Sequence, residues 1–304
     1  MAATDYDSLD KSFGYLVSDA AKVEKIWSGG IWTEGPAYFP AHKSLVWSDI
    51  PNNRMMRYDE TSGEVSVFRH QSNFTNGNAI DRQGRLISCE QGTRRITRTE
   101  HNGDVVVLVD TYKGKRFNSP NDVVIKSDDT IWFTDPAYGI ETDFEGFRAE
   151  SEIGSDNVYR FNPGTGECQV VADDFRRPNG LAFSADETKL YIVDSGGWRF
   201  PENPHHIRVF DVSKENTLSA GEIFAECTNG VFDGFRLDAL GHIWTSAQDG
   251  VHCFHPGGQL LGKILVPETV SNLTFGGERN NRLYITATSS IYTVMLRVKG
   301  QALF

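Results

Sequence analysis

Residues 178–194 read PNGLAFSADETKLYIVD: a polar residue at the head of a short apolar strand, a turn, and a second apolar strand. This pattern occurs six times in the 304 residues of the chain. The polar heads are Glu34, Asn78, Asn121, Asn179, Asp233 and Asn272. The second strands are centred on Trp47, Ile87, Trp132, Tyr191, Trp244 and Tyr284. Successive heads lie 39 to 58 residues apart by subtraction of their numbers, which indicates an internal repeat.

Most units continue with two further strands joined by a tight turn. The turns contain pairs such as Asn102-Gly103 and Pro163-Gly164, which accept the backbone angles of a hairpin. Six units of four antiparallel strands predict an all-β chain that folds as a six-bladed β-propeller. Two unrelated β-sandwiches would also have short strands and frequent turns, but they would not repeat the heads and the aromatic centres.

The repeat also predicts the domain boundary and the closure of the ring. Residues 22–304 are expected to form a single propeller domain, and the polar, acidic residues 1–21 an N-terminal extension. Residues 23–27 precede the first head, so we expect them to pair with residues 291–298 and to close the ring of blades. No long stretch has apolar residues at helical spacing, which predicts few helices.

Composition limits the partners and the compartment. The net charge is −11, from 30 basic and 41 acidic residues, which disfavours nucleic acid and anionic membranes and favours a small neutral or cationic ligand. The chain begins without a signal-peptide pattern, and it has no apolar run long enough to span a membrane. The four cysteines are Cys89, Cys168, Cys227 and Cys253. Because they are widely spaced, we expect reduced thiols in a cytoplasmic protein.

A propeller gathers its six heads around one central channel. Two carboxylates and four amides would form an oxygen-rich site there, and carboxylates in a low dielectric repel one another unless a cation or a proton compensates. Such a donor set suits Ca²⁺, Mg²⁺ or Mn²⁺. Asn and Asp also cap turns, so a head position alone does not make a ligand, whereas Glu34 is a poor turn-capping residue.

Two long loops are expected to surround the channel mouth at the end where the heads lie. They are residues 136–156 and 195–206, and their length and aromatic content favour a function as lids. Within them Tyr138, Trp198 and Arg199 are candidate substrate contacts, whereas adjacent histidines at 205–206 are more often solvated than metal-bound. The chain has no G-x-S-x-G, H-E-x-x-H, P-loop or G-x-G-x-x-G motif.

Four segments resemble the gluconolactonase family, which also includes regucalcin and the luciferin-regenerating enzyme. They are TEGPAYF (33–39), SPND (119–122), PNGLAFSADETKLYIVDS (178–195) and DGFRLDALGHIW (233–244). The resemblance runs from about residue 22 to 297 and is closest to bacterial sugar lactonases. It implies one divalent cation in the channel, with the metal-binding residues of the family on Glu34, Asn179 and Asp233. Asp233 would also be the catalytic acid/base, and Asn121 would lie beside the metal.

Three positions depart from the family pattern. Phe232 stands where Pro is usual, and Gln91 stands where bacterial members often have His. Ser119 occupies the position of a substrate-binding Arg in animal members, so their sugar contacts do not transfer to this chain.

The resemblance and the chemistry together predict metal-dependent hydrolysis of a sugar lactone, with D-glucono-1,5-lactone as the default substrate, to the aldonic acid. Ca²⁺ is the first choice of cation, with Mg²⁺, Mn²⁺ or Zn²⁺ as alternatives. Asp233 would take a proton from the attacking water. The substrate-binding candidates are Asn78, Asn121, Tyr138, Trp198 and Arg199.

Other functions stay open at this point. The chain could hydrolyse a different lactone or an ester, such as an aromatic lactone, or it could be a non-enzymatic metal-binding propeller. Two channel carboxylates, Glu34 and Asp233, favour an enzyme, since a scaffold does not require them. We expect a monomer or a homodimer.

Overall fold

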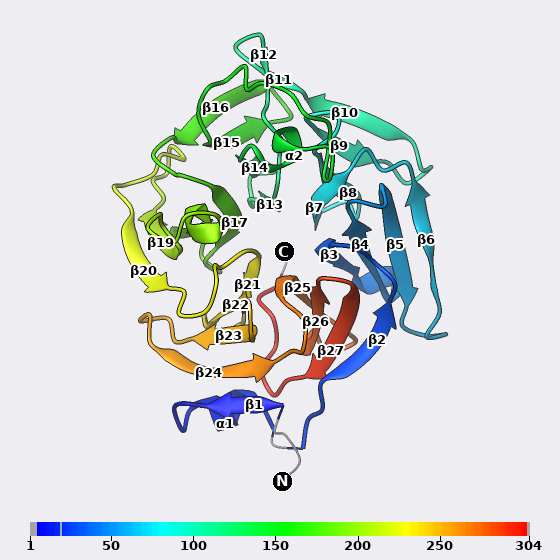
Figure 1. Ribbon diagram of the computed structural model, residues 1–304, viewed down its shortest axis with the longest axis vertical. Coiled ribbons are helices and arrows are strands. Elements are labelled where there is room, and N and C mark those ends of the chain that lie inside the picture. The colour runs from blue at the N-terminus through cyan, green and yellow to red at the C-terminus, as the bar shows by residue number, and fades with distance from the viewer. Residues whose placement is uncertain (1–4, 19, 303–304) are drawn as a thin grey trace.

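The chain folds as a ring of six β-sheets around a central channel (Figure 1). The structure is a computed structural model, and it describes residues 5–18 and 20–302. The first strand of each sheet contacts the first strands of the two neighbouring sheets, so these strands form the inner wall of the ring. We number the sheets as blades 1 to 6 in the chain order of these first strands. The six-bladed propeller predicted from the repeat is therefore confirmed.

Each blade is an antiparallel sheet. Blade 1 contains β3 (Thr33–Phe39), β4 (Ser44–Asp49), β5 (Arg54–Asp59) and β6 (Val65–His70). Blade 2 contains β7 (Thr75–Ile80), β8 (Leu86–Glu90), β9 (Arg95–Thr99) and β10 (Val105–Val109). Blade 3 contains β13 (Val123–Ile125), β14 (Ile131–Asp135), β15 (Asn157–Asn162) and β16 (Glu167–Ala172), and it follows the small hairpin of β11 (Thr111–Tyr112) and β12 (Lys115–Arg116).

The second half of the ring repeats the arrangement. Blade 4 contains β17 (Pro178–Phe183), β18 (Lys189–Asp194), β19 (His206–Asp211) and β20 (Glu222–Glu226). Blade 5 contains β21 (Phe235–Leu237), β22 (Ile243–Ala247), β23 (Gly250–Phe254) and β24 (Leu260–Leu265), with β1 (Tyr6–Ser8) as a fifth strand. Blade 6 contains β25 (Val270–Gly276), β26 (Arg282–Ala287), β27 (Ser290–Met295) and β2 (Glu24–Ser28).

The N-terminal strand β2 closes the ring as predicted. It pairs antiparallel with β27, and the register places Glu24 opposite Thr293 and Ser28 opposite Ser290. Blade 6 is therefore built from both ends of the chain. This closure joins the first and last blades through a ladder of backbone hydrogen bonds instead of leaving the ring open at one junction.

Part of the N-terminal extension also belongs to the packed structure. Strand β1 pairs with β24 at the outer edge of blade 5, and the short helix α1 (Phe13–Leu16) follows it. Phe13, Leu16 and Val17 are buried in the hydrophobic cluster that joins blades 5 and 6. Burial of large apolar side chains stabilises a fold by roughly 1.5–3 kcal/mol each, so this segment contributes to the stability of the ring.

The hydrophobic cores lie between neighbouring blades. The aromatic or aliphatic centre of each second strand is buried, and these residues are Trp47, Ile87, Trp132, Tyr191, Trp244 and Tyr284. Trp132 in blade 3, for example, packs edge-on against Phe183 in blade 4, with ring centroids 5.3 Å apart. The repeated aromatic position in the sequence therefore reports packing between blades.

Acidic residues at the ends of the second strands have a structural function. Asp135 accepts hydrogen bonds from the backbone N–H groups of Asn118 and Ser119 at 2.8 Å each. Asp194 does the same for Arg176 and Arg177 at 2.8 and 2.9 Å. These buried carboxylates fix the backbone of the segment that precedes the first strand of the same blade.

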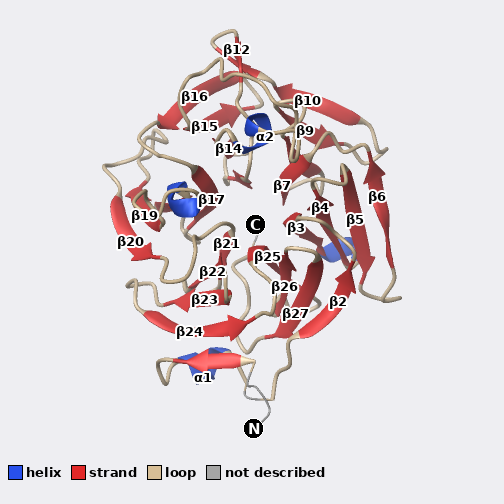
Figure 2. Cartoon of the chain, viewed as in Figure 1, coloured by secondary structure: helices blue, strands red, loops and turns tan. Residues whose placement is uncertain are grey.

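Helices are few, as predicted (Figure 2). In the described part of the chain, the helical elements besides α1 are α2 (Tyr138–Glu141) and two 3₁₀ turns, η1 (Pro40–His42) and η2 (Gly196–Trp198). In residues 5–18 and 20–302, none of the helices has the length and apolar character needed to cross a bilayer. The four cysteines are unpaired.

Candidate functional site

Close contact between neighbouring blades brings the heads of the first strands together. Gly35, Gly180 and Gly234 directly follow a predicted head, and Gly77 directly follows Asn76 in blade 2. A Cβ at any of these glycines would lie 1.9–2.4 Å from an atom of the next blade. The glycine N–H at position 77 donates to the carbonyl of Asn121, which heads the next blade, at 2.7 Å. Only glycine permits this approach, so the ring of heads is narrow.

Strand register corrects two of the six predicted heads. In blades 1, 2, 4 and 6, one residue of the first strand pairs with the last residue of the second strand. In β3 and β17 the predicted head is the residue directly after this paired residue. In β7 the paired residue is Thr75, so the equivalent position is Asn76. Asn78 lies two residues further along. Its amide donates to the carbonyls of Gly35 and Asn76 at 2.9 and 3.0 Å and accepts a bond from Ser88 at 2.7 Å, so it braces the junction of blades 1 and 2.

The sixth predicted head, Asn272, also lies one residue beyond the ring. The equivalent position in β25 is Ser271, whose carbonyl accepts the N–H of Gly234 at 2.8 Å. Asn272 instead donates its amide to Glu34 Oε2 at 3.0 Å. It therefore orients Glu34 across the junction of blades 6 and 1. The pairing of a polar head with a following glycine, as in Asn76-Gly77, was the sequence signal that identifies the correct position in blade 2.

The surroundings of Glu34 and Asp233 disfavour the charged form of both carboxyl groups. Glu34 is 3% exposed, and its Oε2 accepts bonds from the N–H of Gly35 at 2.7 Å and from Asn272. Burial raises the pKa of Glu34, and the nearby charges of Asp122 and Glu145 raise it further. Burial and then repulsion by Glu34 hold the pKa of Asp233 well above its ordinary value. A cation between them would relieve both effects.

Asn179 is fixed beside Asp233 by a hydroxyl from the same blade. Its Nδ2 donates to Ser195 Oγ at 3.1 Å, and that hydroxyl donates to the carbonyl of Phe232 at 2.7 Å. The amide also hydrogen-bonds to Asp233, which lowers the pKa of Asp233 against the stronger effect of burial. Blades 4 and 5 therefore present an amide and a carboxylate together.

These residues line one cavity of about 860 Å³. Of the predicted site residues it contains Glu34, Asn121, Tyr138, Asn179, Trp198, Arg199 and Asp233. Asn78 does not line it, whereas Asn76 does. The side-chain amides of Asn76 and Asn121 form no hydrogen bond with the parts of the chain that the structure describes, so they are available to a ligand. Both long loops contribute to the wall, as expected from their position.

Sequence reasoning missed Glu145, an acidic residue of the cavity wall. Glu145 lies in the loop after α2, and burial and the charge of Glu141 raise its pKa to about 7. Its charge raises the pKa of both Glu34 and Asp233. A residue within a long loop has no periodic pattern around it, so no sequence signal marked Glu145.

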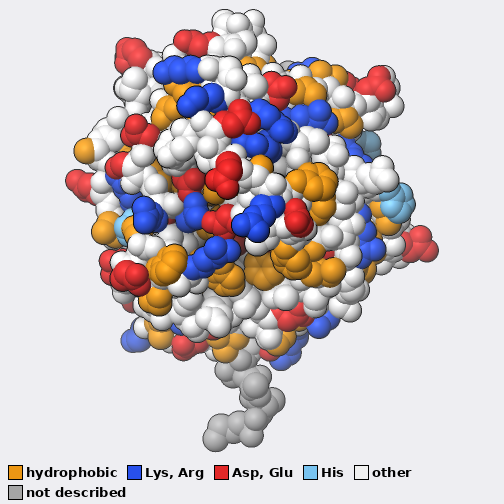
Figure 3. Space-filling model, turned by 45° about the horizontal axis from the view of Figure 1, so that its top comes forward, with side chains coloured by type: hydrophobic (Ala, Val, Ile, Leu, Met, Phe, Trp, Pro, Cys, Tyr) orange, Lys and Arg blue, Asp and Glu red, His pale blue; other side chains and the backbone are white. Residues whose placement is uncertain are grey.

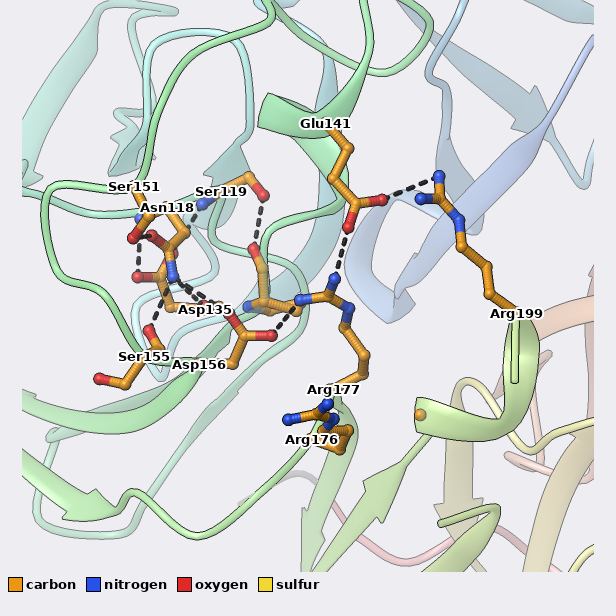
Figure 4. Close-up of polar contacts among 12 residues, drawn as sticks. Asn118, Ser119, Asp135, Glu141, Ser151, Ser155, Asp156, Arg176, Arg177 and Arg199 are labelled. Carbon is orange, nitrogen blue, oxygen red and sulfur yellow. Dashed lines mark hydrogen bonds and ion pairs between the residues drawn. The ribbon is translucent and has the colours of Figure 1, made fainter. Parts of the chain in front are cut away.

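A network of ion pairs holds the two mouth loops together (Figure 4). Glu141 in α2 pairs with Arg199, which follows η2, at 3.0 Å, and it also pairs with Arg177 in the segment before β17. Arg177 binds Asp156 as well, and its guanidinium lies 5.8 Å from the ring centre of Tyr138. The mouth loops are therefore connected to each other and to blade 4.

The donors of the cavity fit a hard divalent cation. Glu34, Asn179 and Asp233 offer oxygen atoms, and the two carboxylates repel each other in a buried site. In the described residues no cluster of three or more His, Cys, Asp or Glu side chains could bind a metal ion. This donor set differs from such a cluster because one of its three members is an amide.

Comparison with known proteins gives a consistent result. Residues 32–289 match the family model described as the SMP-30/Gluconolactonase/LRE-like region. A gluconolactonase of Zymomonas mobilis is 31% identical over 94% of this chain and 84% of its own length. The structure of a gluconolactonase from Xanthomonas campestris superposes with a TM-score of 0.89 at 38% identity and covers 96% of this chain and 94% of that one. A calcium-binding regucalcin from Agrobacterium tumefaciens shares the fold, with a TM-score of 0.76 at 18% identity over 92% of this chain and 95% of that one.

Proposed function

The chain belongs to the SMP-30/gluconolactonase/LRE-like family and is a lactone-hydrolysing enzyme, and on that basis we propose that it hydrolyses a sugar lactone to the aldonic acid. D-Glucono-1,5-lactone is the reference substrate, and one divalent cation, Ca²⁺ first, is the proposed cofactor. The observation that carries the proposal is that the carboxylates of Glu34 and Asp233 line one cavity together with the free amides of Asn76 and Asn121. Unpaired cysteines are consistent with a cytoplasmic enzyme.

Glu34, Asn179 and Asp233 are the residues proposed to hold the cation. When bound, a divalent ion would supply Lewis-acid polarisation of the lactone carbonyl and would neutralise the repulsion between the two carboxylates. The hydrogen bonds from Asn272 to Glu34 and from Asn179 to Ser195 support this assignment, because they fix the orientation of two of the three side chains.

Asp233 is the proposed base. Asp233 is partly exposed in the cavity, whereas Glu34 is buried and accepts hydrogen bonds from Gly35 in blade 1 and Asn272 in blade 6. Asp233 therefore has better access to a water molecule. It would take a proton from that water as the oxygen attacks the lactone carbon, and it would return a proton to the ring oxygen as the C–O bond breaks. The free amides of Asn76 and Asn121 would bind oxygen atoms of the substrate.

A lactone panel with the purified protein and its Asp233→Asn variant tests the proposal. The amide can still offer an oxygen atom but cannot accept a proton at neutral pH, so kcat is expected to fall by about 10²-fold or more. Acid release would be measured for D-glucono-1,5-lactone, for a pentonolactone and for the aromatic lactone dihydrocoumarin, with chelator and with Ca²⁺. Spontaneous hydrolysis is subtracted at each pH.

Each competing function has its own signature in this panel. Faster turnover of dihydrocoumarin than of either sugar lactone would favour an aromatic lactonase. Full activity in chelator would reject the proposal that the enzyme needs a divalent cation. Wild-type kcat in Asp233→Asn would reject Asp233 as the base.

A further inference from the structure

The cavity is larger than a single sugar lactone needs. Cavities of about 300–1,000 Å³ enclose ligands of drug size, and the volume here, about 860 Å³, is near the upper end of that range. A monosaccharide lactone bound near Glu34 and Asp233 would fill only part of this space. The remainder, toward the mouth, has room for a second group of similar size.

The wall of the cavity changes character from the inner end to the mouth. Glu34, Asn121 and Asn179 at the inner end are buried. At the mouth, Trp198 of η2 and Phe144 of the loop after α2 are 64% and 53% exposed. Large aromatic side chains left open beside a binding cavity are a typical mark of a ligand-contacting surface.

Charged and polar groups accompany these aromatic rings. Arg199 is next to Trp198 in the chain, and its ion-pair partner Glu141 ends α2, shortly before Phe144. Both charged residues line the same cavity. Figure 3 shows basic, acidic and hydrophobic side chains side by side over the middle of the molecule. An alkyl chain would gain nothing from the charged groups, whereas a sugar ring offers a flat C–H face to an aromatic ring and hydroxyls to charged neighbours.

The mouth is also organised before a ligand binds. The ion pairs of Glu141 with Arg199 and Arg177 connect the loops that bear Phe144 and Trp198. Backbone hydrogen bonds within each loop, such as that from Gly197 N–H to the carbonyl of Pro204 at 2.7 Å, fix their shapes further. A preorganised surface loses less conformational entropy on binding.

We propose that Trp198 and Phe144 form a second subsite that binds a sugar ring attached to the lactone. The preferred substrate is then a disaccharide aldonolactone, with the lactone ring at Glu34 and Asp233 and the second ring between the aromatic side chains. This inference rests on the proposed lactonase function.

Kinetics with two lactones and two pairs of variants test the subsite. Wild-type kcat/KM is expected to be higher for cellobiono-1,5-lactone than for D-glucono-1,5-lactone. Trp198→Ala and Phe144→Ala should each lower kcat/KM for the disaccharide lactone by about tenfold, mainly through KM, because a central aromatic contact is removed. The loss for the monosaccharide lactone should be smaller, about twofold, since that substrate reaches the second subsite only in part.

The same loops supply matched controls. Phe200 is 56% exposed and close to Trp198 in the chain, but it does not line this cavity. Phe147 is 58% exposed and close to Phe144, but its ring packs against Phe74 at 5.2 Å, outside the cavity lining. Alanine at either position should leave the preference between the two lactones unchanged.

Binding of the stable aldonates separates the subsite from the reaction. Calorimetry with cellobionate and gluconate should show tighter binding of cellobionate, and Trp198→Ala should abolish the difference. A wild-type protein that hydrolyses neither lactone but retains this preference would reject the proposed reaction and support the subsite. Equal losses for both lactones in Trp198→Ala, or a stronger preference for an alkyl lactone such as δ-decalactone, would overturn the proposal.

Discussion

Replacing Glu34 with Gln is expected to raise the melting temperature in chelator and to remove most of the increase that excess cation produces. Glutamine keeps the shape of the side chain, and its oxygen can still accept the hydrogen bonds of Gly35 and Asn272. The change removes one of the carboxylates that repel one another in the cavity. The metal-free variant should therefore be more stable than the metal-free wild type, while it should lose most of the stabilisation by cation.

The magnitude follows from the pKa of Glu34. In the unfolded chain this carboxyl titrates near its ordinary value of 4.5, whereas burial raises the pKa in the folded state. Because the native state holds the proton longer than the unfolded state, metal-free stability falls as pH rises above the unfolded pKa, by about 1.4 kcal/mol per pH unit. At pH 7 the cost is on the order of 3 kcal/mol. A cation at 100 times its Kd stabilises the wild type by about 2.7 kcal/mol.

Thermal melts between pH 5 and pH 8, in EDTA and in excess CaCl₂, measure both effects. Glu34→Gln should melt several degrees higher than wild type in EDTA at pH 7, and the difference should shrink toward pH 5. Glu90→Gln is the matched control, because Glu90 is equally buried but is paired with Arg95 at 2.7 Å. That variant should melt lower in both solutions with the cation-dependent shift retained. A Glu34→Gln protein with the full cation-dependent shift would refute Glu34 as a ligand.

Three further predictions concern other parts of the ring. Asn76→Ala should lower kcat/KM for the lactone with little change in Tm, whereas Asn78→Ala leaves buried carbonyls without donors and should cost about 1–3 kcal/mol in denaturant unfolding; the converse result would restore Asn78 to the site. Gly234→Ala places a methyl group 1.9 Å from the amide of the next blade, so Tm should fall and the cation-dependent shift should weaken, and an unaffected melt would contradict the close approach of blades. Burial alone would raise the pKa of Asp249, but hydrogen bonds from Lys263 and a neighbouring histidine lower it to about 2. Asp249→Asn should therefore be less stable at pH 7 by up to about 1 kcal/mol, and in denaturant titrations the difference should vanish as pH falls from about 4 to 2; a difference independent of pH would contradict the ion pair.

Part of the site could be predicted because it follows a repeat. Glu34, Asn121, Asn179 and Asp233 stand at equivalent positions of their units, and the structure brings all four into one cavity. Asn78 does not line the cavity; the residue of blade 2 that does is Asn76, two positions earlier. Alternation of apolar residues fixes a strand to within a residue or two, but the pairing register with the second strand decides which side chain reaches the channel.

The sequence by itself determined the six blades and their strand pairs, because alternating apolar residues and Gly-containing turns are local properties of the chain. The closure of the ring by β2 followed from the repeat, because a ring of blades leaves no open edge when its first strand pairs with the last blade. Only the tertiary structure decided that β1 extends blade 5, that Asn76 replaces Asn78, and that Glu145 reaches the carboxylates. These features depend on contacts between residues far apart in the chain. A loop held by ion pairs leaves no periodic pattern in the sequence, since its geometry exists only after the blades have packed.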